Sequence, residues 1–369
     1  MRLGFDAKRV FHNATGLGNY ARDVLRILSA HAPGHAYLAY NPRRGRIPFA
    51  AAGVEERRPS GAWALVPPAW RQLGLVRDLV ADRVEVFHGL SNELPSGLQR
   101  SGVAGVVTIH DLIFERYPHL YRPADRRIYR WKFRSAAKRA RRVVAISEQT
   151  RQDLIERYGI PAERIVVVYQ GCNAAFRAEV PPERLAAAAA RHGVTPGFVL
   201  QVGTVEPRKN LAATVEALAG LPDARLVVVG RETAYARQVQ ARVAELGLGG
   251  RVRFLRGVTT EELAALYRLA AVAVYPSFFE GFGIPIVEAL CSGTPVVTTR
   301  GGVFPEAGGP GSAYVDPESP AELRAELAAI LGDADRRARM RTAGLAHAER
   351  FRDEVIAREL LAVYAQAMG

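Results

Sequence analysis

Short apolar runs alternate with longer amphipathic segments twice along this chain of 369 residues, and that repeated alternation is the strongest constraint on its fold. Strands that alternate with helices predict a parallel sheet covered by helices. In the first series we expect strands at 2–5, 36–40, 84–88, 104–109 and 143–146, and helices at 18–30, 71–81, 123–140 and 148–158.

The second series follows Pro181-Pro182, whose polar flank predicts a linker between two domains. Its expected strands are 198–202, 225–229, 252–255, 272–275, 295–298 and 313–315, with helices at 211–219, 234–246, 261–269 and 284–290. Two amphipathic helices, 320–331 and 334–368, complete the chain. A single core rarely grows past about 250–300 residues, so we predict two doubly wound α/β domains, 1–180 and 181–350.

Composition indicates a globular protein of the cytoplasm. The hydrophobic share is 49% and the charged share 24%, and no apolar run approaches the ~20 residues of a membrane span. The chain enters a short strand at once and meets Asp6, which is unlike a signal peptide. Its two cysteines, Cys172 and Cys291, are too few for a disulfide framework and are expected in the core.

The net charge of +13 raises the question of an anionic partner. Cations recur at every fourth position between residues 121 and 142, and aromatic side chains lie among them. If this segment is helical, the cations form one ridge. Either the ridge docks on an anionic membrane surface, or it is a solvated helix face whose aromatics belong to the core. The residues concerned are Arg126, Arg130, Arg134, Lys138 and Arg142, with Tyr121, Tyr129, Trp131 and Phe133.

The segment 280–288 joins a glycine loop to a helix start and carries an acid at each end. Pro285 suits a first helical turn, and the backbone N–H groups of a helix start favour an anion. Acids beside an anion site are useful only if they bind another part of the same ligand. A nucleotide-sugar has such parts, so we expect Glu280 to accept from the sugar hydroxyls and Glu288 from the ribose.

A second candidate element is the loop after the strand 198–202, where Arg208 and Lys209 precede a helix. An arginine offers a planar fork and a lysine a compact point charge, so the two can hold a diphosphate at the carboxyl end of a strand. The alternative, a solvated basic loop, is the usual fate of such a pair in isolation.

Together, Glu280-x7-Glu288 with its internal Gly-Phe-Gly-Ile-Pro, and the Arg208-Lys209 pair, resemble the motifs of retaining glycosyltransferase family 4. The resemblance implies the GT-B fold, in which two Rossmann-like domains face each other across a cleft and a C-terminal helix, here about 351–369, returns to the first domain. It also implies transfer of a hexose from a nucleotide-diphosphate donor, with no metal and no cofactor, and with retention of anomeric configuration.

The resemblance further implies roles for individual residues. Catalysis is carried over onto His110, Glu280, Arg208 and Lys209. Donor binding is carried over onto Gly16, Gly18, Gly203, Arg208, Lys209, Arg231, Gly257, Val258, Glu280, Gly281, Phe282, Gly283, Ile284 and Glu288. His88, which ends another strand, is a further candidate for the cleft.

The segment around His110-Asp111 is similar to bacterial mannosyltransferases of the family, which favours GDP-mannose as donor and a glycan or polyprenyl-linked acceptor in polysaccharide assembly, on the inner face of the membrane. Asp333-Ala334-Asp335 has the spacing of a metal motif, but its place at a helix start indicates a cap. Two alternatives stay open: a sugar-nucleotide epimerase or phosphorylase of the same fold, and a basic nucleic-acid-binding protein, against which no recognised nucleic-acid module appears.

Overall fold

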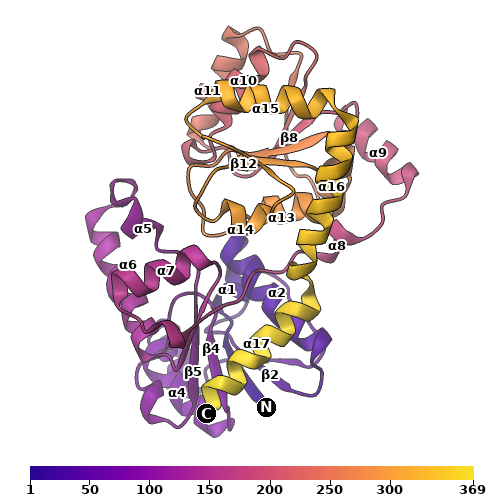
Figure 1. Cartoon of the computed structure of the whole chain (residues 1–369). Coiled ribbons are helices and arrows are strands. Elements are labelled where there is room, and N and C mark those ends of the chain that lie inside the picture. The colour runs from indigo at the N-terminus through magenta and orange to yellow at the C-terminus, as the bar shows by residue number, and fades with distance from the viewer. The chain divides into compact units, whose positions relative to one another are not determined.

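The computed structural model describes all 369 residues, Met1 to Gly369. Its contacts divide the chain into two compact units (Figure 1). The first consists of Met1–Gly171 together with Arg352–Gly369, and the second of Cys172–Phe351. The contacts therefore change at residue 171, before the Pro181-Pro182 pair that the sequence suggested as the linker; Pro182 instead begins a helix.

The first unit is built on seven parallel strands in the order β3-β2-β1-β4-β5-β6-β7. Five of them fall where the alternation predicts. The other two, β3 and β7, were not predicted from the sequence. The bounds are β1 Arg2–Asp6, β2 Ala36–Tyr40, β3 Val54–Arg57, β4 Val86–Gly89, β5 Ala104–Ile109, β6 Arg142–Ala145 and β7 Ile165–Val167.

The helices of the first unit include one irregular segment. The helix expected over 71–81 is a π-helical turn at Trp70–Gly74 set between two short α-helices. The α-helices are α1 Lys8–His12, α2 Gly16–His31, α3 Pro67–Ala69, α4 Leu75–Ala81, α5 Ile113–Arg116, α6 Pro123–Arg139, α7 Glu148–Tyr158 and α17 Asp353–Met368. Single 3₁₀ turns lie at Gly61–Leu65, Leu98–Arg100, Pro118–Leu120 and Ala162–Arg164.

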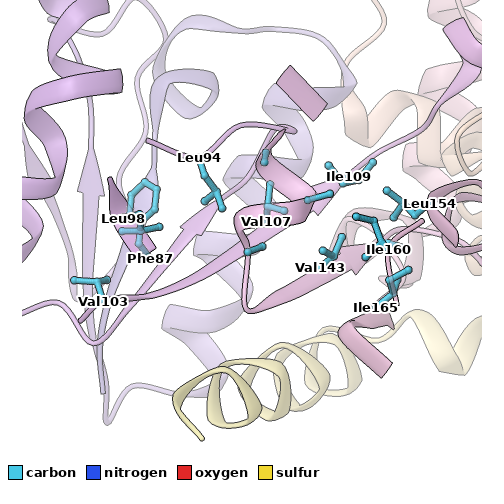
Figure 2. Packing of buried hydrophobic residues seen from close by; sticks show 14 of the residues in the cluster. Phe87, Leu94, Leu98, Val103, Val107, Ile109, Val143, Leu154, Ile160 and Ile165 are labelled. Atoms are coloured by element: carbon cyan, nitrogen blue, oxygen red, sulfur yellow. The ribbon is translucent and has the colours of Figure 1, made fainter. Parts of the chain in front are cut away.

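The hydrophobic core of this unit lies against β4, β5 and β6 (Figure 2). Val107, Ile109 and Val143 come from the central strands, and Leu154 of α7 packs with them. Each fully buried side chain of this kind contributes about 1.5–3 kcal/mol to the stability of the fold. The cluster therefore holds in place the strands whose carboxyl ends carry polar loops.

The C-terminal helix α17 belongs to the first unit, where it contacts α2 and the central strands. Two polar contacts hold it there. Asp353 Oδ2 lies 2.6 Å from Nη1 of Arg26, and the Tyr364 hydroxyl lies 2.8 Å from Nδ1 of buried His88. The expectation of one helix over 334–368 is wrong, because the chain makes a 3₁₀ turn at Glu349–Phe351 and is extended at Arg352.

The second unit has six parallel strands in the order β10-β9-β8-β11-β12-β13, so the predicted pair of parallel-sheet domains is confirmed. The strands are β8 Val199–Val202, β9 Leu226–Val229, β10 Val252–Leu255, β11 Val272–Tyr275, β12 Val296–Thr299 and β13 Ala313–Val315. The helices are α8 Ala174–Arg177, α9 Pro182–His192, α10 Leu211–Ala219, α11 Ala234–Glu245, α12 Thr260–Leu269, α13 Ile284–Cys291, α14 Phe304–Gly308, α15 Pro320–Gly332 and α16 Ala334–Ala348, with a 3₁₀ turn at Pro207–Lys209.

Helix starts follow the local chemistry. Asp333 caps α16 by accepting the Arg336 N–H at 2.8 Å, which confirms its interpretation as a cap. The cap of α12 is Thr259, which forms a capping box with Glu262. Both cysteines are buried and free, as predicted. None of the helices has the length and apolar character to cross a membrane.

Candidate functional site

In each unit the strand order reverses at one point, between β1 and β4 in the first sheet and between β8 and β11 in the second. Ligands of open parallel sheets bind beyond the carboxyl ends of the strands at such a switch point. In the second unit the loops that meet there are 203–210, after β8, and 276–283, after β11. They contain three of the four residues predicted for catalysis and seven of the fourteen predicted for donor binding.

Arg208, Lys209 and Glu280 come together at this switch point. Lys209 Nζ lies 2.5 Å from Glu280 Oε1, and Nη1 of Arg208 lies 2.6 Å from Glu280 Oε2. The lysine and glutamate side chains are only 13% and 11% exposed. The Tyr275 hydroxyl, at the end of β11, donates to Glu280 Oε1 at 3.0 Å, and Lys209 Nζ also contacts that hydroxyl. Residues separated by 71 positions thus form one charged cluster.

The charges within the cluster balance one another. Burial opposes ionisation of Glu280, but Lys209 and Arg208 outweigh it and hold the pKa of this carboxyl below its usual range. Arg208 also pairs with Glu206, whose Oε1 lies 2.5 Å from Nη2. Two cations therefore face two carboxylates. Phosphate oxygens of a ligand would take over these cations from Glu280, which would free its carboxylate for hydroxyl groups.

Asn210 ties the two loops of the cluster together. Its backbone is left-handed, with φ 55°, a conformation that asparagine tolerates better than most residues. Its Nδ2 donates to the carbonyl oxygens of Pro276 at 3.2 Å and Pro317 at 2.7 Å. The Phe278 N–H also donates to the Arg208 carbonyl at 3.0 Å. Neither Asn210 nor Tyr275 was predicted, although Asn210 directly follows Lys209 and Tyr275 ends the strand that precedes the Glu280 loop.

Gly203 begins the first loop with φ 142°, and Gly230, at the end of β9, lies against it. A Cβ atom on Gly230 would lie 1.9 Å from the Gly203 carbonyl oxygen. Close approach of the two backbones therefore requires glycine at 230.

The segment 281–288 forms the predicted loop and helix start. Gly283 precedes α13 with φ 117°, and Pro285 lies in the first turn. The Phe282 side chain is buried against Phe351, with ring centroids 5.6 Å apart, so only its backbone remains for the predicted donor contact. Glu288 Oε2 accepts the Tyr267 hydroxyl at 3.2 Å. Gly281 and Ile284 are partly exposed on either side of Gly283.

Three residues predicted for donor binding, Arg231, Gly257 and Val258, follow the ends of β9 and β10. Arg231 is exposed, and its carbonyl accepts the Val205 N–H at 2.9 Å, which places it beside the loop after β8. Gly257 is left-handed, with φ 64°, and Val258 follows it half-buried. Arg256 pairs with Glu232 through two contacts of 2.6 and 2.7 Å, a bidentate ion pair that the sequence did not reveal.

In the first unit, His110 ends β5 and is buried. Its Nε2 donates to the Leu90 carbonyl at 2.9 Å, and its backbone N–H donates to Asn92 Oδ1 at 2.9 Å. Because a carbonyl can only accept, the proton of the neutral ring lies on Nε2, and Nδ1 is an acceptor without a protein partner. Such a nitrogen can accept a hydrogen bond from a sugar hydroxyl.

His88 is not available to a ligand, and the two glycines at the start of α2 differ from each other. His88 cannot serve a ligand, because Nδ1 bonds to Tyr364 and Nε2 to Thr108 Oγ1 at 2.8 Å each. Gly16 is exposed at the helix start with open space around it. Gly18 is buried, and a Cβ there would lie 1.8 Å from the Asn13 carbonyl oxygen, so packing alone accounts for this glycine.

Lowering the pH from 7 to 5 is expected to destabilise the protein through these two histidines. Burial lowers the pKa of His88 to about 3 and that of His110 to about 4, whereas an unfolded histidine titrates near ~6.5. Below pH ~6.5 the unfolded chain binds more protons, so the free energy of unfolding falls toward acid, by about 2 kcal/mol per histidine at pH ~5. Urea unfolding at the two pH values measures the change. In a His88→Gln variant the free energy of unfolding should differ less between the two pH values. If it differs as much as in the unmodified protein, His88 does not contribute to the acid destabilisation.

Side-chain clusters suited to a metal do not occur: no group of three or more His, Cys, Asp or Glu residues is placed to hold an ion.

Comparison with known proteins matches each unit to a family model. The model described as "Glycosyl transferases group 1" matches residues 186–347, and "Glycosyltransferase Family 4" matches residues 14–176. The O-antigen chain mannosyltransferase B of Escherichia coli is 31% identical over 296 residues, which are 79% of this chain and 75% of that protein.

Two further proteins are similar at lower coverage or identity. The D-inositol 3-phosphate glycosyltransferase of Streptomyces bingchenggensis is 33% identical over 246 residues, 62% of this chain and 53% of that protein. Among solved structures, Anabaena HepE in complex with UDP and glucose has a TM-score of 0.75 and 20% sequence identity, with 99% of both chains covered. At 20% identity, the similarity to HepE concerns the fold alone.

Proposed function

The chain belongs to the family 4 glycosyltransferases, and on that premise we propose that it moves a hexose from a nucleotide-diphosphate sugar to an acceptor hydroxyl with retention of configuration. The observation that carries the proposal is the cluster of Arg208, Lys209 and Glu280 at the switch point of the second unit. It combines cations for a diphosphate with an acceptor for sugar hydroxyls.

On this proposal the barrier lies in separating negative charge onto the leaving diphosphate. Arg208 and Lys209 stabilise that charge as it develops, helped by the backbone N–H groups near Gly283. Glu280, released from its ion pairs, positions the sugar. The acceptor attacks from the same face as the leaving group, and a diphosphate oxygen takes its proton. The reaction needs no metal, because the protein supplies the positive charge.

For the donor we propose GDP-mannose. The similarity to an O-antigen mannosyltransferase supports mannose as the transferred sugar. The similarity to D-inositol 3-phosphate glycosyltransferases does not favour any particular sugar. A thermal-shift screen against GDP-mannose and UDP, TDP and ADP sugars tests the base, and product analysis with labelled GDP-mannose tests the reaction. We expect GDP-mannose to stabilise the protein most and to yield a mannosylated acceptor. If only UDP sugars stabilise the protein, GDP-mannose is not its donor. If a labelled epimer or sugar phosphate is the only product, the protein is not a glycosyltransferase.

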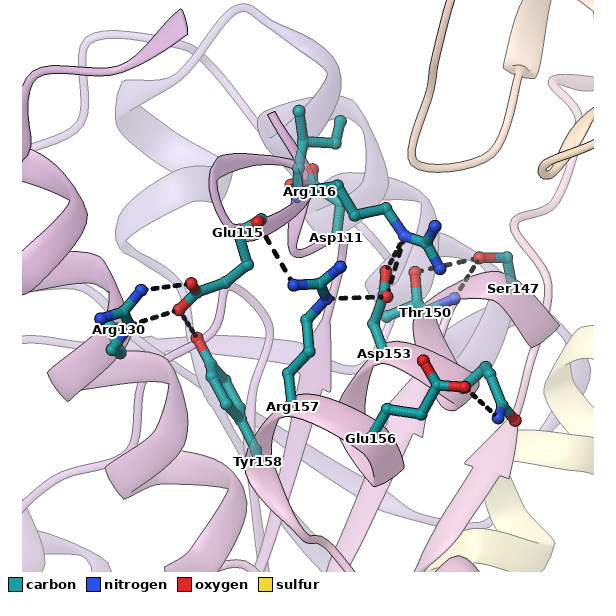
Figure 3. Close-up of polar contacts among 12 residues, drawn as sticks. Asp111, Glu115, Arg116, Arg130, Ser147, Thr150, Asp153, Glu156, Arg157 and Tyr158 are labelled. Atoms are coloured by element: carbon teal, nitrogen blue, oxygen red, sulfur yellow. Dashed lines mark hydrogen bonds and ion pairs between the residues drawn. The ribbon is translucent and has the colours of Figure 1, made fainter. Parts of the chain in front are cut away.

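For the acceptor we propose a lipid-linked glycan reached at the inner face of the membrane, with helix α6 against the anionic surface. Trp131 on α6 is exposed, and Arg134 and Lys138 follow it along the exposed side. The predicted ridge is shorter than expected, since α6 ends at Arg139 and Arg142 begins β6. Figure 3 shows that Arg130 is held by Glu115 through two contacts of 2.5 and 2.7 Å, so it is already paired. Tyr121 and Phe133 pack on the core.

Replacing Arg126, Arg134 and Lys138 with glutamine is expected to weaken binding to anionic vesicles about 10- to 100-fold at low salt, because each cation near such a surface contributes about 1 kcal/mol. Sedimentation with phosphatidylglycerol vesicles measures the partition. The matched control replaces the exposed Arg184, Arg225 and Arg237 of the second unit. Equal loss in both triple variants rules out a specific role for α6.

A further inference from the structure

The loop that follows β4, residues 90–93, folds back tightly on the end of its own strand. Gly89 ends β4, and a Cβ atom on it would lie 2.0 Å from the carbonyl oxygen of Glu93. Because that oxygen belongs to backbone, only glycine allows residue 93 to return so close to the strand. Asn92 lies within this closed loop.

Asn92 attaches the loop to β5 through two hydrogen bonds. Its backbone N–H donates to the Thr108 carbonyl at 2.9 Å, and its Oδ1 accepts the His110 N–H at 2.9 Å. Asn92 is buried, and its backbone is left-handed, with φ 62°. The chain has only three such residues other than glycine, and one of the others is Asn210 of the donor cluster. Backbone of this kind persists where the surroundings enforce it, and it gathers at functional sites.

The same loop also restrains the His110 ring. Leu90, two residues before Asn92, accepts the proton of His110 Nε2 at its carbonyl oxygen, 2.9 Å away. The Tyr20 ring packs edge-on against the imidazole, with centroids 4.6 Å apart and an interplanar angle of 87°. The histidine is therefore held at its backbone, at Nε2 and along one side of its ring.

Nδ1 is the polar atom of His110 that remains for a ligand. It has no protein partner and is not among the fully buried polar atoms. Burial and the charge of Arg9 lower the pKa of His110 to about 4, so the ring is neutral at pH 7. A neutral imidazole carries one proton, and only its placement on Nε2 makes Nδ1 an acceptor. An unrestrained ring would share that proton between its two nitrogens and would turn about its Cβ–Cγ bond.

We propose that Asn92 is a positioning residue for sugar transfer: by anchoring the loop 90–93, it keeps the His110 proton on Nε2 and presents Nδ1 to a hydroxyl of the hexose. The inference rests on the proposed function, since it requires a sugar that donates to His110. Asn92 acts through His110, because its own side chain is buried and bonded to the His110 N–H.

Asn92→Gly and Asn92→Asp separate the side chain from the backbone that carries it. Both replacements tolerate left-handed backbone, but only aspartate keeps an oxygen for the His110 N–H. We expect Asn92→Gly to lower kcat about 10- to 100-fold, the loss that a small displacement of a reacting group can cause. The KM for the donor should change little, because the diphosphate keeps Arg208 and Lys209. Asn92→Asp should retain most of the kcat of the unmodified protein.

Val84→Ala is the control for a general loss of stability. Val84 is buried and precedes β4, at the opposite end of that strand from Asn92. The substitution removes core volume away from the loop and from His110. If Val84→Ala lowers kcat as much as Asn92→Gly does, or if Asn92→Asp is as impaired as Asn92→Gly, then Asn92 contributes only to folding and the proposal is overturned.

The tautomer of His110 provides a readout that needs no activity. Long-range proton–nitrogen NMR spectra of protein containing labelled histidine show which ring nitrogen carries the proton. A His110→Gln variant identifies the signal among the eight histidines. We expect only the Nε2–H form in the unmodified protein and a mixture of both tautomers in Asn92→Gly. An unchanged Nε2–H signal in Asn92→Gly overturns the role of Asn92, because the ring is then held without it.

The outcomes also separate this inference from the proposed function. If the enzyme transfers a hexose and Asn92→Gly keeps both its kcat and its Nε2–H signal, the inference is overturned and the glycosyltransferase stands. If the protein turns over no nucleotide-sugar while Asn92→Gly still changes the tautomer, the proposed function is overturned, and Asn92 remains only the residue that sets the protonation of His110.

Discussion

Lys209→Ala is expected to lower kcat/KM by about 100- to 1,000-fold, the loss typical when one group that stabilises developing negative charge is removed. Lys209 is nearly buried and sits between Glu280 and Tyr275, where water replaces its ammonium group poorly. Arg208 alone would then face the leaving diphosphate. Steady-state kinetics with the donor identified by thermal shift measures the effect.

The fold should survive this substitution, because Glu280 keeps Arg208 and the Tyr275 hydroxyl as partners. We expect a loss of only about 1–2 kcal/mol in the free energy of unfolding, less than for a buried charge left alone. The control is Arg242→Ala, which removes an exposed cation that pairs with Glu216 on the surface of the same unit. Unchanged kinetics in Lys209→Ala would remove this lysine from the catalytic apparatus.

Gly230→Ala is expected to cost about 3 kcal/mol or more of the free energy of unfolding and to reduce activity strongly. The new methyl carbon would lie 1.9 Å from the Gly203 carbonyl oxygen and 2.6 Å from its carbon. Both atoms belong to backbone, so no side-chain rotation relieves the clash, and overpacking of this kind lies at the costly end of its range. The loop that begins at Gly203 must move, and Lys209 lies on that loop.

Gly249→Ala provides the control, since Gly249 lies in a surface turn with open space around its ideal Cβ position. Its effect should be neutral or slightly stabilising, because alanine reduces the entropy of the unfolded chain. Urea unfolding and donor turnover measured on both variants give the comparison. Equal stability of the two variants would show that the two backbones at Gly203 and Gly230 are not in contact in solution.

Most of the fold could be predicted because its strands are apolar and buried on both faces. Two strands lacked that signal. β3 (Val54–Arg57) reads Val-Glu-Glu-Arg and lies at the edge of the sheet, where polar side chains remain solvated. β7 (Ile165–Val167) has three residues, too few for any periodicity. The π-helical turn at Trp70–Gly74 has the same apolar spacing as an ordinary helix and could not be distinguished from one.

The candidate site was predictable as a list of residues and less so as an arrangement. Arg208, Lys209 and Glu280 were expected to share one ligand, and the structure brings them together. A sequence motif gives no distances between side chains, so it could not show that these three residues form ion pairs with one another. Phe282 and His88 illustrate the converse: the sequence made both of them candidates, but the Phe282 side chain packs against Phe351 and His88 is bonded to Tyr364 and Thr108.

The pairing of Glu280 with both cations also bears on turnover after chemistry. A spent nucleoside diphosphate can attract Arg208 and Lys209 but offers no hydroxyls in place of the departed hexose, so buried Glu280 would keep only the Tyr275 hydroxyl as a partner. Re-formation of the internal ion pairs competes with the product for the same cations. On the proposed mechanism an intact donor would satisfy all three side chains at once, and we expect the enzyme to bind its donor in preference to the by-product and so to resist product inhibition.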